Sequence, residues 1–132
     1  MPKKTKIHGH GWWHRRLDKK LGDWLRETHN ECAWCHKPGY LTTSHVKPKG
    51  KYQGLRYDLM NVLPMHGNCH IFEWHANPTE SGKWFEENYP ERAVYLEEAK
   101  KVFVKRDQAY YEKVDKALDE KDAKSLLVLD KA

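Results

Sequence analysis

The chain has 132 residues, which is the length of one ordinary domain and too short for two well-cored ones. It carries 24 Lys and Arg against 19 Asp and Glu, a formal net charge of +5, and 39% of its residues are hydrophobic. So small an apolar fraction closes only a small core, which a bound metal ion would supplement. Because the sequence has neither a run of about 18 apolar residues nor a secretory signal, we expect a cytoplasmic protein without a membrane span.

Positive charge is concentrated in the first half of the chain. Residues 1–56 hold 13 Lys and Arg against 4 Asp and Glu, whereas residues 57–132 hold 11 against 15. A basic half joined to a mildly acidic half predicts that one face meets a polyanion, for which nucleic acid is the first choice. A solvated lysine-rich surface explains the same counts, so the charge pattern needs the support of motifs.

The chain begins with a basic arm over residues 1–13, in which Gly9 and Gly11 interrupt any helix. We expect this arm to be flexible. From about residue 14 to residue 28, apolar residues recur at i, i+4, i+7 and i+8, which predicts one amphipathic helix. The polar, cysteine-bearing segment 32–39 then predicts a tight turn.

Two short strands and a helix are predicted in the middle of the chain. Residues 40–46 are β-prone, and the basic, proline-containing loop 47–51 cannot continue a central strand. Residues 58–65 read as a second short strand. Asn68 is a suitable cap for a helix over residues 69–75.

Residues 79–132 predict a helical extension of the same domain. Thr79 or Ser81 is expected to cap a short helix, and Pro90 suits the first position of the next one. Apolar residues at helical spacing predict two buried faces: Tyr95, Ala99, Val102 and Phe103, then Tyr111, Val114 and Leu118. The fold class is therefore α+β, with a preceding amphipathic helix, a strand–strand–helix core and a C-terminal helical extension.

The cysteines and one histidine have the spacing of a zinc knuckle. An odd count of three cysteines makes a poor disulfide framework, whereas a C-x-x-C pair and a later H-x-x-C pair suit one tetrahedral ion. The four candidate ligands are Cys32, Cys35, His66 and Cys69. We expect them to hold a structural Zn²⁺. His36 and His70 are competing ligands, but each is adjacent to a cysteine ligand, and neighbouring residues rarely turn both side chains onto one ion.

With Cys69 assigned to the knuckle, His70 is free for other chemistry and joins a second polar set with His45 and Asn61. Their order, on a strand, on the next strand and on a helix, resembles the ββα-metal site of the HNH (His-Me finger) endonucleases. The resemblance covers about residues 32–78, so we expect residues 14–78 to form a zinc-knuckled HNH nuclease domain. The tail around Trp84-Phe85 and Pro90-Glu91-Arg92 is similar, more weakly, to phage recombination nucleases of the NinG kind.

The resemblance implies a role for each residue of this set. His45 is the expected general base, Asn61 holds the His45 loop, and His70 binds a catalytic divalent cation, Mg²⁺, Mn²⁺ or Ni²⁺. Many family members carry an acidic residue where this chain has Ser44, so the second protein ligand is open; His75 is favoured slightly over Glu73. The candidate phosphate contacts are Lys47, Lys49, Lys51 and Arg56.

The sequence thus predicts a metal-dependent HNH endonuclease that hydrolyses DNA phosphodiester bonds, on phage recombination or branched intermediates. The alternative is a non-catalytic, zinc-stabilised nucleic-acid-binding module. In either case the helical tail offers a surface for a second copy of the chain or for a larger phage protein. A phage-encoded protein of this kind would work in the cytoplasm of the bacterial host.

Overall fold

The fold is mixed helix and strand, and mostly helical. It is given by a computed structural model that describes residues 6–129, with the backbone alone at residue 72. The helices are α1 (His10–Thr28), α2 (Pro78–Asn88), α3 (Pro90–Ala99), α4 (Gln108–Glu120) and the π-helix η3 (Cys69–His75). Two strands, β1 (Thr42–His45) and β2 (Val62–Met65), and three short 3-10 turns, η1 (Gln53–Leu55), η2 (Leu59–Asn61) and η4 (Lys124–Leu126), complete the order.

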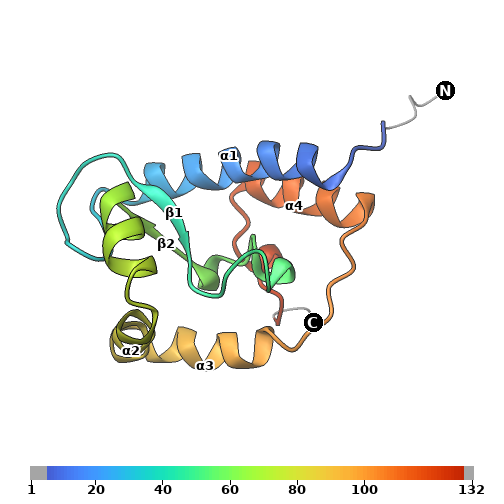
Figure 1. The fold of residues 1–132 in the computed structure, drawn as a ribbon. Coiled ribbons are helices and arrows are strands. Elements are labelled where there is room, and N and C mark those ends of the chain that lie inside the picture. The colour runs from blue at the N-terminus through green and yellow to red at the C-terminus, as the bar shows by residue number, and fades with distance from the viewer. Residues whose placement is uncertain (1–5, 130–132) are drawn as a thin grey trace.

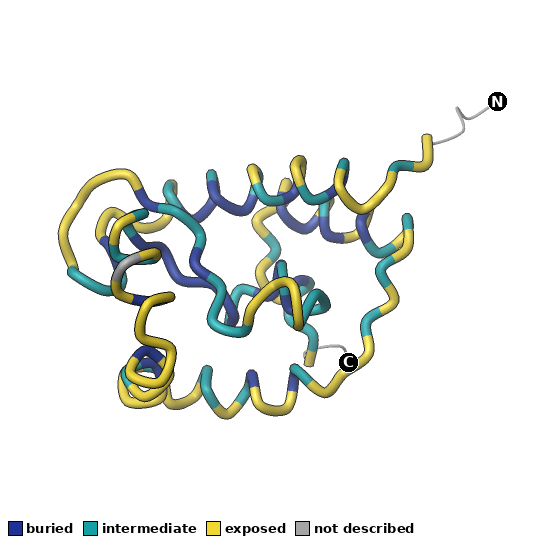
Figure 2. Tube along the Cα trace, in the orientation of Figure 1, coloured by how far each residue is buried: buried dark blue, intermediate teal, exposed yellow. Residues whose placement is uncertain are grey.

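Helices α1 and α4 run side by side along one edge of the molecule, and α3 lies along the opposite edge with the hairpin between them (Figure 1). Buried residues run through the hairpin and recur along α1 and α4, whereas α2 is exposed over most of its length (Figure 2). Two apolar clusters result. The first lies between α1 and α4, and the second joins the knuckle turn and the hairpin to α2 and α3.

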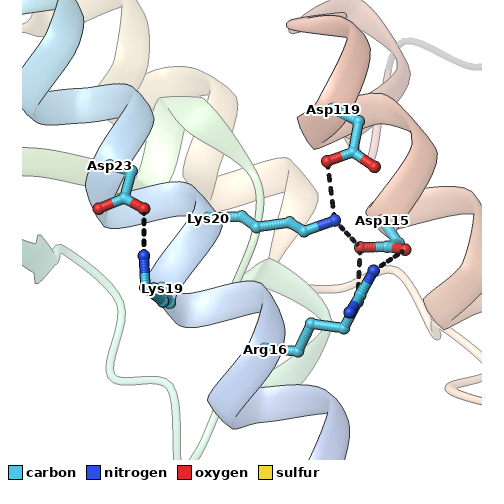
Figure 3. Close-up of polar contacts among 6 residues, drawn as sticks. All are labelled: Arg16, Lys19, Lys20, Asp23, Asp115 and Asp119. Carbon is cyan, nitrogen blue, oxygen red and sulfur yellow. Dashed lines mark hydrogen bonds and ion pairs between the residues drawn. The ribbon is translucent and has the colours of Figure 1, made fainter.

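Ion pairs reinforce the contact between α1 and α4. The side chains of Arg16 and Lys20 on α1 both reach Asp115 on α4, at 3.1 and 2.6 Å, and Lys20 also reaches Asp119 at 2.7 Å (Figure 3). Tyr111 and Leu118 of α4 are buried beneath this network, against α1. The apolar face predicted for this part of the tail therefore packs on its own domain, and a partner would have to use another surface of the extension.

The first helix begins at His10, four residues before the predicted start. Trp13 is 4% exposed, stacks on Tyr111, and donates a hydrogen bond from Nε1 to Oε1 of Gln108 at 3.2 Å. This packing outweighs the helix-interrupting effect of Gly11. Residue Lys6 also contacts α4, since its carbonyl accepts a bond from Gln108 at 3.1 Å. Residues 10–13 of the predicted arm therefore belong to α1, and its first five residues lie outside the described part of the chain.

The hairpin is antiparallel, with His45 opposite Val62 and Thr42 opposite Met65. Each strand is four residues long, shorter than its sequence pattern suggests. The second strand starts late because Asp58 caps a 3-10 turn instead, its carboxylate accepting a bond from the backbone N–H of Met60 at 2.9 Å.

The helical tail differs from the expectation at two points. Ser81 caps nothing: it is buried inside α2, and its hydroxyl donates to the carbonyl of Trp74 at 2.8 Å. Helix α3 ends at Ala99, so Val102 and Phe103 lie outside it and are 43% and 87% exposed. The apolar spacing continues past a point where the chain must turn to reach α4, and spacing alone carries no information about that turn.

Candidate functional site

The four predicted zinc ligands form one cluster. Their ligand atoms all lie within 4.8 Å of one another, and no other group of three or more His, Cys, Asp or Glu side chains within residues 6–129 is arranged to hold a metal ion. The turn after α1 supplies Cys32 and Cys35, and the end of β2 with the start of η3 supplies His66 and Cys69. A Cys₃His set of this compactness could hold a tetrahedral Zn²⁺, and its four protein ligands make it a structural type of site.

Backbone and ring contacts orient these ligands. The sulfur of Cys32 accepts bonds from the backbone N–H groups of Trp34 and His66, both at 3.4 Å. Burial alone would raise the pKa of the Cys32 thiol, but the backbone of Cys35, followed by the N–H groups of His66 and Trp34, outweighs burial and lowers the pKa. The Nε2–H of His66 donates to the carbonyl of Pro38 at 3.0 Å, which leaves Nδ1, 3.2 Å from the sulfur of Cys35, as the ligand nitrogen.

The turn between the ligands depends on one glycine. Gly39 has a φ of +137°, and a Cβ at that position would lie 2.9 Å from Nε2 of His66. Only glycine combines this conformation with so close an approach to the ring. His36, a competing ligand by sequence, is exposed and lies outside the cluster, with Nδ1 3.6 Å from a carboxylate oxygen of Glu31.

His45 is the last residue of β1, and its ring is held in one tautomer. Its Nε2 lies 2.9 Å from the carbonyl oxygen of Arg56, which only accepts hydrogen bonds, so Nε2 carries the proton. Nδ1 is then left with a free lone pair. Burial lowers the pKa of His45 to about 4, so the ring is neutral at physiological pH and Nδ1 can accept a proton.

Arg56 has a different role from the one predicted for it. Its guanidinium makes two bonds to Asp18 on α1, at 3.0 and 2.5 Å, and its side chain is only 13% exposed. The hydroxyl of Tyr57 donates to the same carboxylate at 3.0 Å. The charge of Arg56 is therefore neutralised within the protein, and the prediction that it contacts phosphate is not supported by its position. Nothing in the sequence around Asp18 distinguishes it from the other charged residues of the predicted helix.

The side chain of Asn61 forms hydrogen bonds with both ends of the loop that follows β1. The residue is fully buried, its Oδ1 accepts from the backbone N–H of Lys47 at 2.7 Å, and its Nδ2 donates to the carbonyls of Lys47 and Leu55, both at 3.1 Å. Since Arg56 follows directly after Leu55, Asn61 also fixes the carbonyl that holds His45. The structure thus places Asn61 where a loop-positioning role needs it.

His70 and His75 come together in η3. Their Nε2 atoms lie 2.7 Å apart, although on an α-helix residues five apart point in different directions. The π-helical i→i+5 geometry of this segment removes the conflict. Burial lowers the pKa of His70, with smaller effects from His75 and Lys49. Within residues 6–129, no hydrogen bond joins the carboxylate of the alternative ligand Glu73 to either ring.

One cavity of about 710 Å³ lies beside these groups; we call it the His45 cavity. His45 and His75 both line it, as do Lys47, Lys51 and residues of α2 and α3. The positive charge of Lys49 lowers the pKa of both His45 and His70, so this lysine lies near enough to act electrostatically on both rings. Ser44 lies elsewhere: it is 1% exposed, and its hydroxyl finds no hydrogen-bond partner within the described chain.

The lysines of the loop after β1 are not equivalent. Nζ of Lys47 forms an ion pair with Glu97 of α3 at 2.8 Å, which partly neutralises the positive charge of this lysine. Lys49 and Lys51 are exposed, and among residues 6–129 no carboxylate lies within ion-pair distance of either. These two are therefore the better placed of the predicted phosphate contacts.

Comparison with protein-family models, with curated proteins and with solved structures finds no match to this chain. None of the helices formed by residues 6–129 combines the length and apolar character that a bilayer crossing requires.

Proposed function

We propose that this protein is a metal-dependent endonuclease of the HNH type that hydrolyses phosphodiester bonds in DNA. The observation that carries the proposal is the state of His45: a neutral ring, locked by the Arg56 carbonyl with Nδ1 free, on a cavity that His75 also lines. A largely buried histidine with a fixed tautomer, beside a pair of histidines and exposed lysines, is suited to general-base hydrolysis of an anionic substrate.

In the proposed reaction, Nδ1 of His45 takes a proton from a water molecule whose oxygen attacks the phosphorus. The bond from phosphorus to the departing 3′ oxygen breaks as the new P–O bond forms; the 3′ oxygen takes a proton from solvent water, and the His45 imidazolium returns its proton to solvent. A bound phosphate anion raises the pKa of His45 from about 4, because negative charge stabilises the imidazolium that forms. His70 and His75 would hold a divalent cation through their paired Nε2 atoms, and such a cation neutralises charge on the phosphate and the leaving oxygen.

The substrate class follows from charge and position. Lys49 and Lys51 are exposed next to the His45 cavity, and contacts from lysines to phosphate supply the salt-dependent part of nucleic-acid affinity. These contacts position a backbone without reading its sequence.

The test is nicking of supercoiled plasmid with Mg²⁺, Mn²⁺ or Ni²⁺, comparing wild type with His45→Ala. We expect cleavage by the variant to fall at least about 100-fold, the usual contribution of a general base, while salt-sensitive DNA binding persists. His29→Ala is the matched control, because His29 is exposed and its ring bonds only within its own helix end. Equal cleavage by wild type and His45→Ala would contradict the proposal.

A zinc-stabilised nucleic-acid-binding module without catalysis is the second candidate. The position of Ser44 favours it, because a buried hydroxyl replaces the acidic ligand that many HNH enzymes carry there. Under this alternative wild type binds DNA with the same salt dependence but nicks no plasmid with any of the three cations.

A further inference from the structure

The His45 cavity is larger than hydrolysis requires. Its volume of about 710 Å³ is within the range of roughly 300–1,000 Å³ found for small-molecule sites. The proposed chemistry uses only His45 and His75 of its lining. The remaining walls come from the loop after β1, from η3 and from α2 and α3, and they include the buried apolar side chains of Trp74 on η3 and Phe85 on α2.

A glycine in the middle of α2 forms part of the cavity wall. Gly82 lines the cavity, is exposed, and a Cβ added there would meet no atom within 4 Å. A larger side chain can therefore be introduced at this point of the wall without a clash at its Cβ, which makes position 82 a suitable place to alter the cavity.

The rim of the cavity matches a nucleotide. Lys47 and Lys51 line it on the loop side, and Nζ of Lys51 lies 5.4 Å from the ring centre of the half-buried Tyr52, which also lines it. Aromatic faces stack bases of any sequence, and the carboxylate of Glu86 in the same lining can accept a bond from an exocyclic amino group. Lys47 pairs with Glu97, which also lines the cavity, so Lys51 is the lysine of this rim left to contact a phosphate, and an apolar peptide would not use that charge.

We propose that the His45 cavity is a nucleobase-binding subsite, which takes an unpaired base next to the phosphate held at His45. This inference rests on the proposed function, since it is the bound strand that places a base at the opening. A base inside a duplex must first leave its pair and its stack, and that step costs free energy. The subsite therefore favours strands whose base is already unpaired over a continuous duplex.

The test measures binding of the full-length chain to a single-stranded oligonucleotide and to the duplex of the same sequence, by fluorescence anisotropy. We expect wild type to bind the unpaired strand about tenfold more tightly, a preference that one stacked base can supply. Gly82→Phe adds an aromatic ring to the wall of the cavity, which should reduce the space for a base, so this variant should bind both forms equally. A single 2-aminopurine in the strand should change its emission on binding to wild type but not to Gly82→Phe.

Two variants control for folding. Gly82→Ala should be more stable than wild type and keep the preference, because a methyl group leaves most of the cavity empty. Gly11→Phe places the same ring in α1, outside the cavity, where an added Cβ meets only the end of the flexible Arg15 side chain. It should also keep the preference.

The subsite is overturned if Gly82→Phe binds and discriminates as wild type does, or if wild type binds both forms equally. Plasmid cleavage by His45→Ala tests the proposed chemistry independently of the subsite. If that variant cleaves normally while Gly82→Phe has lost its preference, only the proposed chemistry fails. If His45→Ala is inactive while Gly82→Phe behaves as wild type, only the subsite fails.

Discussion

Asp18 is connected to His45 through a single residue of the chain, Arg56. Its carboxylate holds the guanidinium of Arg56 and the hydroxyl of Tyr57, while the carbonyl of Arg56 holds the His45 ring. Burial would raise the pKa of Asp18, but its bonds to Arg56 outweigh burial and lower it. The first helix, remote in sequence, therefore positions the proposed general base.

Asp18→Asn should lower cleavage about 10- to 100-fold, the usual effect of losing a group that orients a catalytic residue. The negative charge of Asp18 raises the pKa of His45, and the positive charge of Arg56 lowers it. Asparagine has the same size as aspartate but no charge, so in the variant only the effect of Arg56 remains. The pKa of His45 then falls further. The acidic limb of the pH–rate profile should move to lower pH and its plateau should drop, as a weaker base requires.

Asp23→Asn is the matched control for this prediction, because Asp23 lies on the same helix and pairs only with Lys19 and Arg26 of that helix. Its pH–rate profile should coincide with that of wild type. A profile of Asp18→Asn that also coincides with wild type would show that Asp18 does not act on His45.

At the scale of an element, the π-helix η3 decides which residue accompanies His70. Its extra residue per turn turns His75 toward His70, whereas Glu73 keeps only backbone contacts, through its carbonyl, with Asn77 and Ser81. π-Helical turns are rare and frequently occur at functional sites. The geometry thus favours His75 over Glu73 as the second ligand of a catalytic cation.

His75→Ala should weaken Mn²⁺ or Ni²⁺ binding about 10-fold or more, because removal of one of two imidazoles leaves a single protein ligand. Isothermal titration of the zinc-loaded protein measures this affinity apart from the knuckle. Glu73→Ala, two residues away on the same exposed segment, should bind these ions as wild type does. The opposite order of effects would assign the cation to Glu73.

At the scale of the whole molecule, the four clustered ligands come from segments that also pack together in the second apolar cluster. Cys32, Met65 and Trp74 are buried in that cluster, and the carbonyl of Pro64 in β2 accepts the backbone N–H of Ala33 at 2.8 Å, beside the ligand turn. An ion bound by the Cys₃His cluster would tie the end of α1 to the end of the hairpin and the start of η3. In a chain of this size such a cross-link contributes to folding directly.

Cys69→Ser should lose the equivalent of zinc that we expect in the purified wild-type protein, measured by inductively coupled plasma mass spectrometry. Its free energy of unfolding in urea should fall by at least about 3 kcal/mol, since three ligands bind the ion far less tightly than four. A chelator should destabilise wild type similarly and leave Cys69→Ser nearly unchanged. If wild type contains no zinc and is nevertheless as stable as it is with zinc, the ion does not contribute to the stability of the fold.

Local patterns in the sequence were sufficient for the elements and for the knuckle. Periodicity, the position of Pro90 and the H-x-x-C spacing predict the amphipathic helix, both strands, the start of α3, and the four clustered ligands, whereas α2 starts at Pro78, before the predicted caps. These features depend on residues close together in the chain, where spacing alone largely sets geometry. The early start of α1 and the end of α3 were missed, because each depends on packing against α4 or on a turn toward it.

Tertiary structure alone decided the details of the site. The ion pair between Arg56 and Asp18, the carbonyl that fixes His45, and the His45 cavity all join segments distant in sequence. The pairing of His70 with His75 is local, yet it depends on a π-helical backbone, which the residue pattern does not predict. Residue types and their spacing limit which chemistry is available, whereas burial and long-range contacts determine each group's charge, tautomer and access to a ligand.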